Sequence, residues 1–441
     1  MNFIDLIEKK KQGKNHTKEE IKYISDSICN GSVSDAQISA WLMAVCFNGM
    51  SIQETADLTE VLAFSGDKVD LGEIKGCVID KHSTGGVGDK VTITLIPLLA
   101  ASGISVVKIA DKGIAMAAGT IDKLKSIPNF KTSYNDIAII NQVKNIGAII
   151  ASQTENMAPS EKKLYSLRST TDTANSKELI ASSILSKKIA SGVNTIFVDV
   201  KYGAGTFMKT PEEAVSLSNL IVDISKRLNL SVTAVVSSME EPLGRAIGNS
   251  IEVIEAIEFL KGNIKDGDLA ELTYFFASLI LVKAGLFNDC ENARKFLTEI
   301  INSGKALEKF AEILSAQGAD PAILNSYDKF ELPSFKVECA SKKDGFVQYI
   351  NAKSIAMALN TLGGTSDNNS SEIDYSVGIY LNKKSGEFVK KGETLYTIYS
   401  NDEDKTRKAQ KYCDEAFLIN DSKPANKNLV YKIIGIEEED V

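Results

Sequence analysis

The sequence predicts a multi-domain protein of the α and α/β classes: a small all-α lobe, a large α/β lobe with a mostly parallel sheet, and a C-terminal α+β domain. Two patterns lead to this prediction. Apolar residues recur every three to four positions over the first 65 or so residues, which is typical of helices. From about residue 75, short β-branched runs alternate with helical segments, which is typical of a buried parallel sheet. A chain of 441 residues is long enough for two or three such domains.

The first lobe is expected over residues 1–65, where Ile21, Ile24 and Ile28 show the helical repeat. Asp35 and Ser51 are the expected N-caps in this region, because short oxygen-bearing side chains accept hydrogen bonds from the first turn of a helix.

The α/β lobe is expected over residues 66–162 and 194–330. Its predicted strands are short, rich in β-branched residues and separated by helical segments. They are Val78-Ile79, Val106 to Ile109, Ala148 to Ile150, Ile196 to Val200 and Val232 to Val236.

A helical insertion, residues 163–193, interrupts this alternation and is expected to complete the α lobe. Ser176, followed by Glu178, predicts the start of its second helix. The chain would then cross between the lobes near residues 65–72, 156–160 and 191–194. A cleft between lobes joined in this way is a common ligand site, and closure across it is a common motion.

Residues 331–441 are expected to form the C-terminal α+β domain. Lys343 to Val347 and Tyr375 to Ser400 alternate like antiparallel strands, and Lys383 to Gly386 predicts a turn.

Composition and charge narrow the function classes. A net charge of −8 argues against a nucleic-acid partner. The apolar stretches are too short or too interrupted to span a membrane. Six scattered cysteines indicate reduced thiols, and two histidines leave little material for a zinc site. We therefore expect a cytoplasmic protein.

The segment Asp80-Lys81-His82-Ser83-Thr84-Gly85-Gly86-Val87-Gly88-Asp89-Lys90 carries the strongest functional signal. Its glycines let the backbone N–H groups approach a ligand, and its lysines and hydroxyls add further donors. This array suits a small oxyanion such as phosphate. It matches neither the P-loop nor the Rossmann fingerprint, and a simple strand-to-helix turn is the alternative.

The motifs together resemble the thymidine/pyrimidine-nucleoside phosphorylase family over essentially the whole chain. They are Lys81 to Lys90, Gly119 to Pro128, Leu164 to Arg168, Ile180 to Lys188, Asp199 to Met208, and in the last domain Lys343 to Gly345, Val377 to Ile379 and Val389 to Glu393. The resemblance implies a homodimeric pentosyltransferase for reversible phosphorolysis of a pyrimidine nucleoside or deoxynucleoside to free base and pentose 1-phosphate. Phosphate is then the co-substrate, and no organic cofactor is expected.

The resemblance also implies roles for individual residues. His82, Arg168 and Lys187 would be catalytic, although a neutral His82 packed beside the loop is the alternative. The base would contact Arg168, Ser183, Lys187, Met116, Ile180 and Phe207. Phosphate would contact Lys81, Ser83, Gly88, Thr92, Lys108 and Thr120. A monovalent cation such as K⁺, which some family members bind, would lie among Gly88, Lys90, Leu243, Ala246 and Glu255.

The chain departs from the family between residues 110 and 120. The family usually reads Ser-Gly-Arg-Gly-Leu-Gly-His-Thr-Gly-Gly-Thr, whereas this chain reads Ala-Asp-Lys-Gly-Ile-Ala-Met-Ala-Ala-Gly-Thr. Ala110 removes a hydroxyl, Met116 removes a histidine, and Ala115 and Ala118 replace glycines. Because the changes cluster, we expect an altered substrate pocket. The alternatives are a non-catalytic nucleoside- or phosphate-binding homologue and a phosphoribosyltransferase-like reaction that needs metal-bound pyrophosphate.

Overall fold

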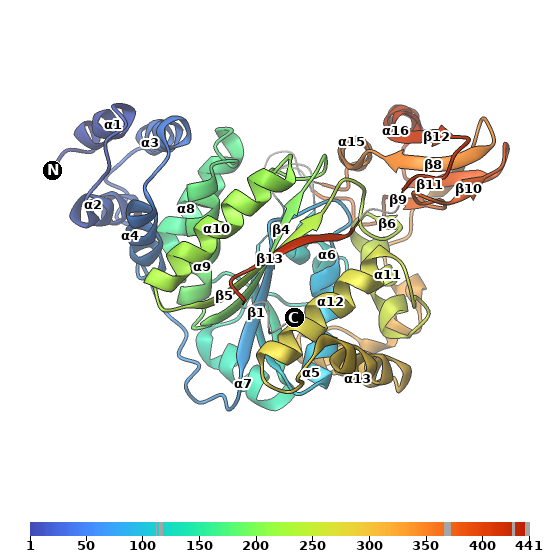
Figure 1. The fold of residues 1–441 in the computed structure, drawn as a ribbon, viewed down its shortest axis with the longest axis horizontal. Coiled ribbons are helices and arrows are strands. Elements are labelled where there is room, and N and C mark those ends of the chain that lie inside the picture. The colour runs from blue at the N-terminus through green and yellow to red at the C-terminus, as the bar shows by residue number, and fades with distance from the viewer. Residues whose placement is uncertain (112, 114–117, 366–371, 426–427, 437–441) are drawn as a thin grey trace.

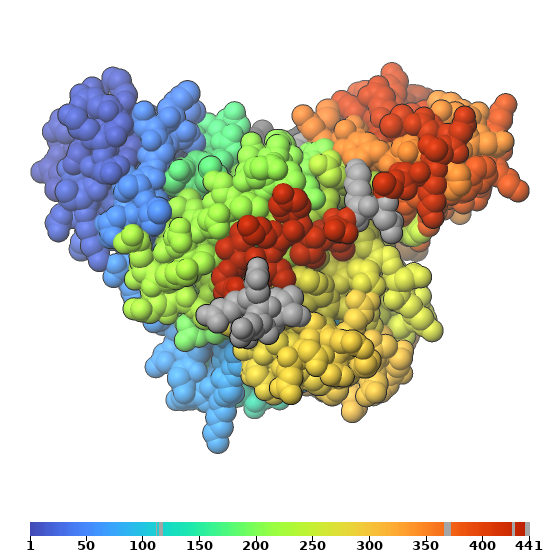
Figure 2. Space-filling view, viewed as in Figure 1, coloured from blue at the N-terminus to red at the C-terminus, as the bar shows by residue number. Residues whose placement is uncertain are grey.

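The computed structural model describes residues 1–111, 113, 118–365, 372–425 and 428–436, and these form the three expected parts. In Figure 1 the first four helices lie at one end, the α/β domain in the centre, and the C-terminal domain at the other end. The two end parts project from the same side of the central domain (Figure 2). Among the described residues, no helix combines the length and apolarity needed to cross a bilayer.

The helical lobe has six helices drawn from two parts of the sequence. They are α1 (Phe3–Lys11), α2 (Lys18–Cys29), α3 (Asp35–Asn48), α4 (Ile52–Ala63), α8 (Pro159–Thr170) and α9 (Lys177–Ala190). Leu164 of α8 and Leu179 of α9 join the core around Trp41, so the insertion packs on the N-terminal helices as expected.

The N-caps of this lobe agree with the sequence except at one position. Ser51 and Ser176 cap α4 and α9 as predicted. The prediction for α3 was wrong by one residue: Ser34, not Asp35, is the cap, because Ser34 forms a reciprocal capping box with Gln37.

The central sheet has six strands in the order β13-β5-β4-β1-β2-β3, and all pair in parallel except β13. Their bounds are β1 (Val78–Ser83), β2 (Ser105–Ala110), β3 (Ala148–Ser152), β4 (Thr195–Tyr202), β5 (Ser231–Ser238) and β13 (Val430–Ile434). Adjacent residues alternate between the two faces, as Val106 and Val107 do by joining different hydrophobic clusters. Each face is therefore buried under its own layer of helices.

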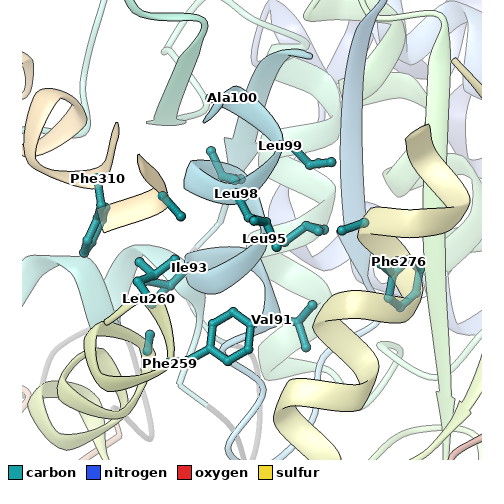
Figure 3. Close-up of a cluster of buried hydrophobic side chains, with 14 of the residues drawn as sticks. Val91, Ile93, Leu95, Leu98, Leu99, Ala100, Phe259, Leu260, Phe276 and Phe310 are labelled. Carbon is teal, nitrogen blue, oxygen red and sulfur yellow. The ribbon is translucent and has the colours of Figure 1, made fainter. Parts of the chain in front are cut away.

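The covering helices are α5 (Val91–Ala101), α6 (Thr120–Lys125), α7 (Asp136–Ile146), α10 (Pro211–Arg227), α11 (Asn249–Leu260), α12 (Asp268–Lys283), α13 (Cys290–Asn302) and α14 (Lys305–Ala316). Helix α5 carries apolar residues on all sides, which suits its position, since other helices enclose it. Figure 3 shows its residues among Phe259 of α11, Phe276 of α12 and Phe310 of α14. The loop that precedes α5 is thus anchored to the most deeply buried helix of the domain.

The C-terminal part contains two short antiparallel sheets and two helices. Its elements are β7 (Phe335–Ala340), β8 (Gly345–Ile350), α15 (Ala352–Leu362), β9 (Gly378–Leu381), β10 (Phe388–Val389), β11 (Thr394–Ser400), α16 (Glu403–Ala416) and β12 (Phe417–Asn420). The central and C-terminal domains each contribute a strand to the other's sheet. The predicted domain boundary between residues 330 and 331 does not include this exchange. Strand β6 (Ala246–Ile247) pairs with β9, and β13 returns to the central sheet beside β5.

The three segments that cross between the helical lobe and the central domain lie against one another. Asp67 N donates to Asn156 O at 2.8 Å, and Val69 N donates to Ala190 O at 2.9 Å. Gly66 is required here, since a Cβ on it would lie 1.9 Å from Asn156 O. The helical lobe is therefore joined to the sheet through one compact set of backbone contacts.

Candidate active site

A cavity of about 210 Å³ lies between the carboxyl ends of β1 and β2 and the facing helices α8 and α9. It is thus the cleft between the two lobes that the chain crossings led us to expect. Its walls come from the glycine-rich loop after β1, the end of β2, the segment before α6, helices α8 and α9, and the turn after β4. The strand order reverses between β1 and β4, and the carboxyl ends of strands at such a point commonly bind ligands.

The glycine-rich loop is held by its own side chains. Ser83 Oγ donates to Asp89 Oδ2 at 2.6 Å and accepts from Gly85 N at 3.2 Å. Burial raises the pKa of Asp89, but Lys201, Lys81 and Lys123 outweigh it, so the pKa is lowered and the carboxylate stays charged. Ser83 therefore faces the cavity on a fixed loop.

Lys108 supplies the main cation on the sheet side of the cavity. It extends from β2, and its Nζ donates to Lys81 O at 2.7 Å. Burial lowers the pKa of Lys108 to about 7; Asp80 opposes this shift, and Lys188 and Lys81 add to it. Thr92, in the first turn of α5, and Thr120, at the start of α6, line the same end.

His82 lines the cavity beside this cluster. Burial lowers its pKa well below the usual value, and the charges of Lys188, Lys108 and Lys187 add to that effect. Its Nδ1 has no hydrogen-bond partner in the described structure. The imidazole is therefore neutral at neutral pH and can donate or accept one hydrogen bond, but it contributes no charge.

Two residues expected at the phosphate, Lys81 and Gly88, do not line the cavity. The Nζ of Lys81 lies 3.0 Å from Asp199 Oδ2 and 5.0 Å from the ring centroid of Phe276. The reason is the neighbouring strand β4, whose Asp199 holds the Lys81 ammonium beside the sheet. Gly88 instead packs on the backbone, because a Cβ there would lie 2.5 Å from Leu243 O.

The helical wall of the cavity carries the residues expected at the base. Ile180, Ser183 and Lys187 line it from α9. Ser183 Oγ donates to Glu161 Oε1 at 2.5 Å. Phe207 lines it from the turn after β4. One wall therefore combines a hydroxyl, a cation and apolar surface.

Arg168 lines this wall at the end of α8, but most of its donors are already used. Its guanidinium donates to the carbonyls of Thr173, Ala174 and Leu179 at 3.0–3.4 Å. Burial lowers its pKa from the usual value. Because arginine has five N–H groups, two remain for a ligand.

Three lining or supporting residues were missed by the sequence reasoning: Asp111, Glu161 and Tyr165. Lys187 Nζ lies 2.5 Å from Asp111 Oδ2, 3.6 Å from Glu161 Oε1 and 4.3 Å from the ring centroid of Tyr165. Asp111 stands where the related motif has a glycine. That difference was the available sequence signal for a new carboxylate in the site. Ala110 and Ala118 line the cavity, whereas Met116 and Ala115 lie outside the described residues.

The positions expected to hold a monovalent cation do converge, but around a side chain. Lys90 Nζ donates to Leu243 O at 2.9 Å, Ala246 O at 2.7 Å and Glu255 Oε2 at 2.6 Å. The side chain of a charged lysine has donors only, and here its ammonium occupies the point at which these oxygens converge. The expected K⁺ does not fit this residue set. Elsewhere in the described ranges, no three His, Cys, Asp or Glu side chains are grouped as a metal site requires.

The fold and the cavity define a class of protein: a two-lobed α/β protein that places an anion-binding loop opposite a polar helical wall. Comparisons with known proteins agree. Residues 4–66 match the model of the glycosyl transferase family, helical bundle domain, and residues 75–307 match the glycosyl transferase family, a/b domain. Residues 346–420 match the pyrimidine nucleoside phosphorylase C-terminal domain.

Two curated relatives share one description. A pyrimidine-nucleoside phosphorylase of Staphylococcus epidermidis is 43% identical over 98% of this chain and 100% of its own length. One of Geobacillus stearothermophilus is 43% identical over 91% of this chain and 93% of its own length. The chain belongs to the pyrimidine-nucleoside phosphorylase family. The anthranilate phosphoribosyltransferase of Thermus thermophilus, with a TM-score of 0.57 and 16% identity over 71% of this chain and all of its own, shares the fold.

Proposed function

We propose that this protein catalyses the reversible phosphorolysis of a pyrimidine nucleoside, giving the free base and a pentose 1-phosphate. The observation that carries the proposal is that one cavity has Ser83, Thr92 and Lys108 at one end and Ser183 and Lys187 at the other. One end suits an oxyanion and the other suits a ring with carbonyl groups. The shared description of the relatives supports the same reaction.

In the proposed reaction a phosphate oxygen forms a bond to C1′ of the sugar while the bond from C1′ to the base nitrogen breaks. The bonding electron pair leaves with the base, which takes up the proton that the phosphate releases. Phosphate is already an anionic nucleophile, so the protein mainly has to position it. Ser83, Thr92, Thr120 and the cation of Lys108 are the groups that would do so.

Negative charge grows on the base as that bond breaks, and donors on the helical wall would stabilise it. Lys187 provides the charge: burial lowers its pKa, but Asp111 and Glu161 outweigh it and keep the pKa raised, so the ammonium persists. Ser183 and the unused donors of Arg168 would bind the carbonyls. His82, neutral in its environment, would hydrogen-bond the sugar or phosphate rather than carry charge.

The specificity is proposed to differ from that of an ordinary family member, because Asp111 adds a carboxylate at the base end. A carboxylate can only accept hydrogen bonds, and the carbonyl groups of uracil and thymine are acceptors as well. Asp111 therefore cannot form a hydrogen bond with those carbonyls. No organic cofactor has a part in this reaction. Which base the pocket prefers then depends on how strongly Asp111 restrains Lys187.

The protein is further proposed to be cytoplasmic and to form a homodimer through its helical lobe. The support is the exposure of large apolar side chains there: Phe47 of α3 is 82% exposed and Ile4 of α1 is 59% exposed. A partner packed against this lobe would remove both side chains from water, which is favourable for apolar surface.

The deciding experiment measures base release from a panel of nucleosides with and without phosphate. The panel contains thymidine, deoxyuridine, uridine, cytidine, base- and sugar-modified uridines, and purine nucleosides as controls. Phosphate-dependent release from a pyrimidine nucleoside supports the proposal, and release from cytidine or a modified nucleoside alone supports the specificity change. Nucleoside binding without any release would contradict the proposal and favour a non-catalytic homologue.

A further inference from the structure

Lys90 is the last residue of the glycine-rich loop and is completely buried. Its ammonium has three hydrogens, and each has an acceptor: Leu243 O, Ala246 O and Glu255 Oε2, at 2.6–2.9 Å. Two carbonyls and one carboxylate converging on a point are the oxygen ligands that a hard monovalent cation takes. In this protein the ammonium of Lys90 occupies the position that such a cation would take.

The surrounding backbone is shaped to this ammonium. Gly244 has a φ of +70°, and a Cβ there would lie 2.8 Å from Lys90 Nζ and 2.6 Å from Glu255 Oε2. Leu243 N also donates to Val87 O at 3.0 Å, which ties the same segment to the loop. A side chain at residue 244 would therefore collide with both the ammonium and its carboxylate partner.

Glu255 completes the arrangement by holding the chain that bends around Lys90. Its Oε1 accepts from Arg245 N at 2.7 Å, and its Oε2 accepts from Ala246 N at 3.0 Å as well as from Lys90. Burial lowers the pKa of Lys90, but Glu255 and Glu252 outweigh it, so the pKa is raised. The ammonium is therefore charged throughout the neutral pH range.

The contacts connect parts of the molecule that are distant in sequence. Lys90 directly precedes α5, Glu255 lies on α11, and Ala246 begins β6, which pairs with β9 of the C-terminal sheet. The same ion pair thus fixes the end of the glycine-rich loop to the helix layer and to the C-terminal domain.

We propose that Lys90 is an internal substitute for a bound monovalent cation, and that it positions the glycine-rich loop without any ion from solution. The proposal does not rest on the proposed reaction, because its main test is stability. It replaces the expectation of a K⁺ site among Gly88, Lys90, Leu243, Ala246 and Glu255.

The test compares thermal unfolding midpoints in chloride salts of K⁺, Na⁺ and tetramethylammonium at one ionic strength. The wild-type midpoint is expected to be equal in all three. Lys90→Thr removes the ammonium and leaves an oxygen, so its midpoint should fall by several degrees in tetramethylammonium and recover in K⁺. Lys90→Met removes the ammonium without supplying an oxygen ligand, so it should fall without recovering.

A second readout follows the loop itself. Stabilisation by added inorganic phosphate should be reduced in Lys90→Thr in tetramethylammonium and restored by K⁺, a cation-specific rescue that a purely structural defect would not give. A saturable rise of the wild-type midpoint with K⁺, or one K⁺ per chain retained through gel filtration, would overturn the proposal. A Lys90→Thr protein whose unfolding midpoint does not change with K⁺ would also overturn the proposal. If that variant does not fold, the wild-type comparison still decides.

Discussion

The ammonium of Lys187 lies 2.5 Å from the carboxylate of Asp111, inside the cavity that both residues line. Burial raises the pKa of Asp111, but Lys187 outweighs it and the pKa is lowered, so the pair is ionic. Charge that would otherwise act on a ligand is shared with a neighbouring carboxylate. The strength of this ion pair therefore determines how much positive charge Lys187 presents to the base.

Removing the carboxylate should release that charge. We expect Asp111→Asn to raise kcat/KM for uridine or thymidine about tenfold, equivalent to ~1.4 kcal/mol in the transition state. Glu161 remains 3.6 Å from Lys187, so the ammonium keeps one carboxylate neighbour. Steady-state kinetics on both nucleosides checks this. Asp111→Glu, which retains the charge, is the control, and an equal gain in that variant would contradict the explanation.

Ser183 and Ser182 offer a matched pair on one helix. Both are buried, but only Ser183 lines the cavity, where it donates to Glu161. Ser183→Ala should lower kcat/KM by roughly tenfold to a hundredfold, since one hydrogen bond near a charged group contributes about 1.5–3 kcal/mol. Ser182→Ala should leave the kinetics unchanged. Similar losses in the two variants would show that the effect is a general disturbance of α9.

Anion binding should depend on pH through Lys108. Its pKa of about 7 means that the ammonium is charged below this pH and neutral above it. Affinity for an oxyanion should therefore be highest below about pH 7 and fall by up to about tenfold per pH unit above it, until the higher pKa of the complex is reached. Sulfate is the suitable probe because it does not itself titrate there.

The measurement is the sulfate inhibition constant between about pH 6 and about pH 9. Lys108→Arg serves as the control, because an arginine stays charged over this range. Its profile should be flat. A wild-type profile that is equally flat would rule out Lys108 as the titrating group.

The crossing between lobes should be intolerant of added volume. A Cβ at Gly66 would lie 1.9 Å from the backbone oxygen of Asn156, whereas at Gly72 the nearest atom is a side-chain oxygen of Asp70 at 3.1 Å. Gly66→Ala should lower the free energy of unfolding by about 1–3 kcal/mol or more, because backbone must move. Gly72→Ala should change it by less than about 0.5 kcal/mol. Denaturant titration of both variants distinguishes them.

Much of the site could be anticipated because its residues lie in local patterns. The hydroxyls at Ser83 and Thr92 flank a glycine-rich turn after a strand, and Ser183 and Lys187 lie one helical turn apart. Both sets face the cavity in the structure. The resemblance predicts Lys81 at the phosphate, whereas in the structure its ammonium pairs with Asp199 of β4 and does not line the cavity.

The sequence by itself determined the kind of each segment: the helical lobe with its insertion, the five parallel strands, three helix caps to within one residue, and a loop chemistry suited to an anion. These features depend on hydrogen bonds and side-chain periodicity within a few residues, which a linear pattern contains. Only the tertiary structure decided the role of Lys90. Its acceptors Leu243 and Glu255 lie 153 and 165 residues away along the chain, and their convergence depends on how α5, α11 and β6 pack. The same holds for Asp111 and Lys187, which meet only because two lobes close around one cavity.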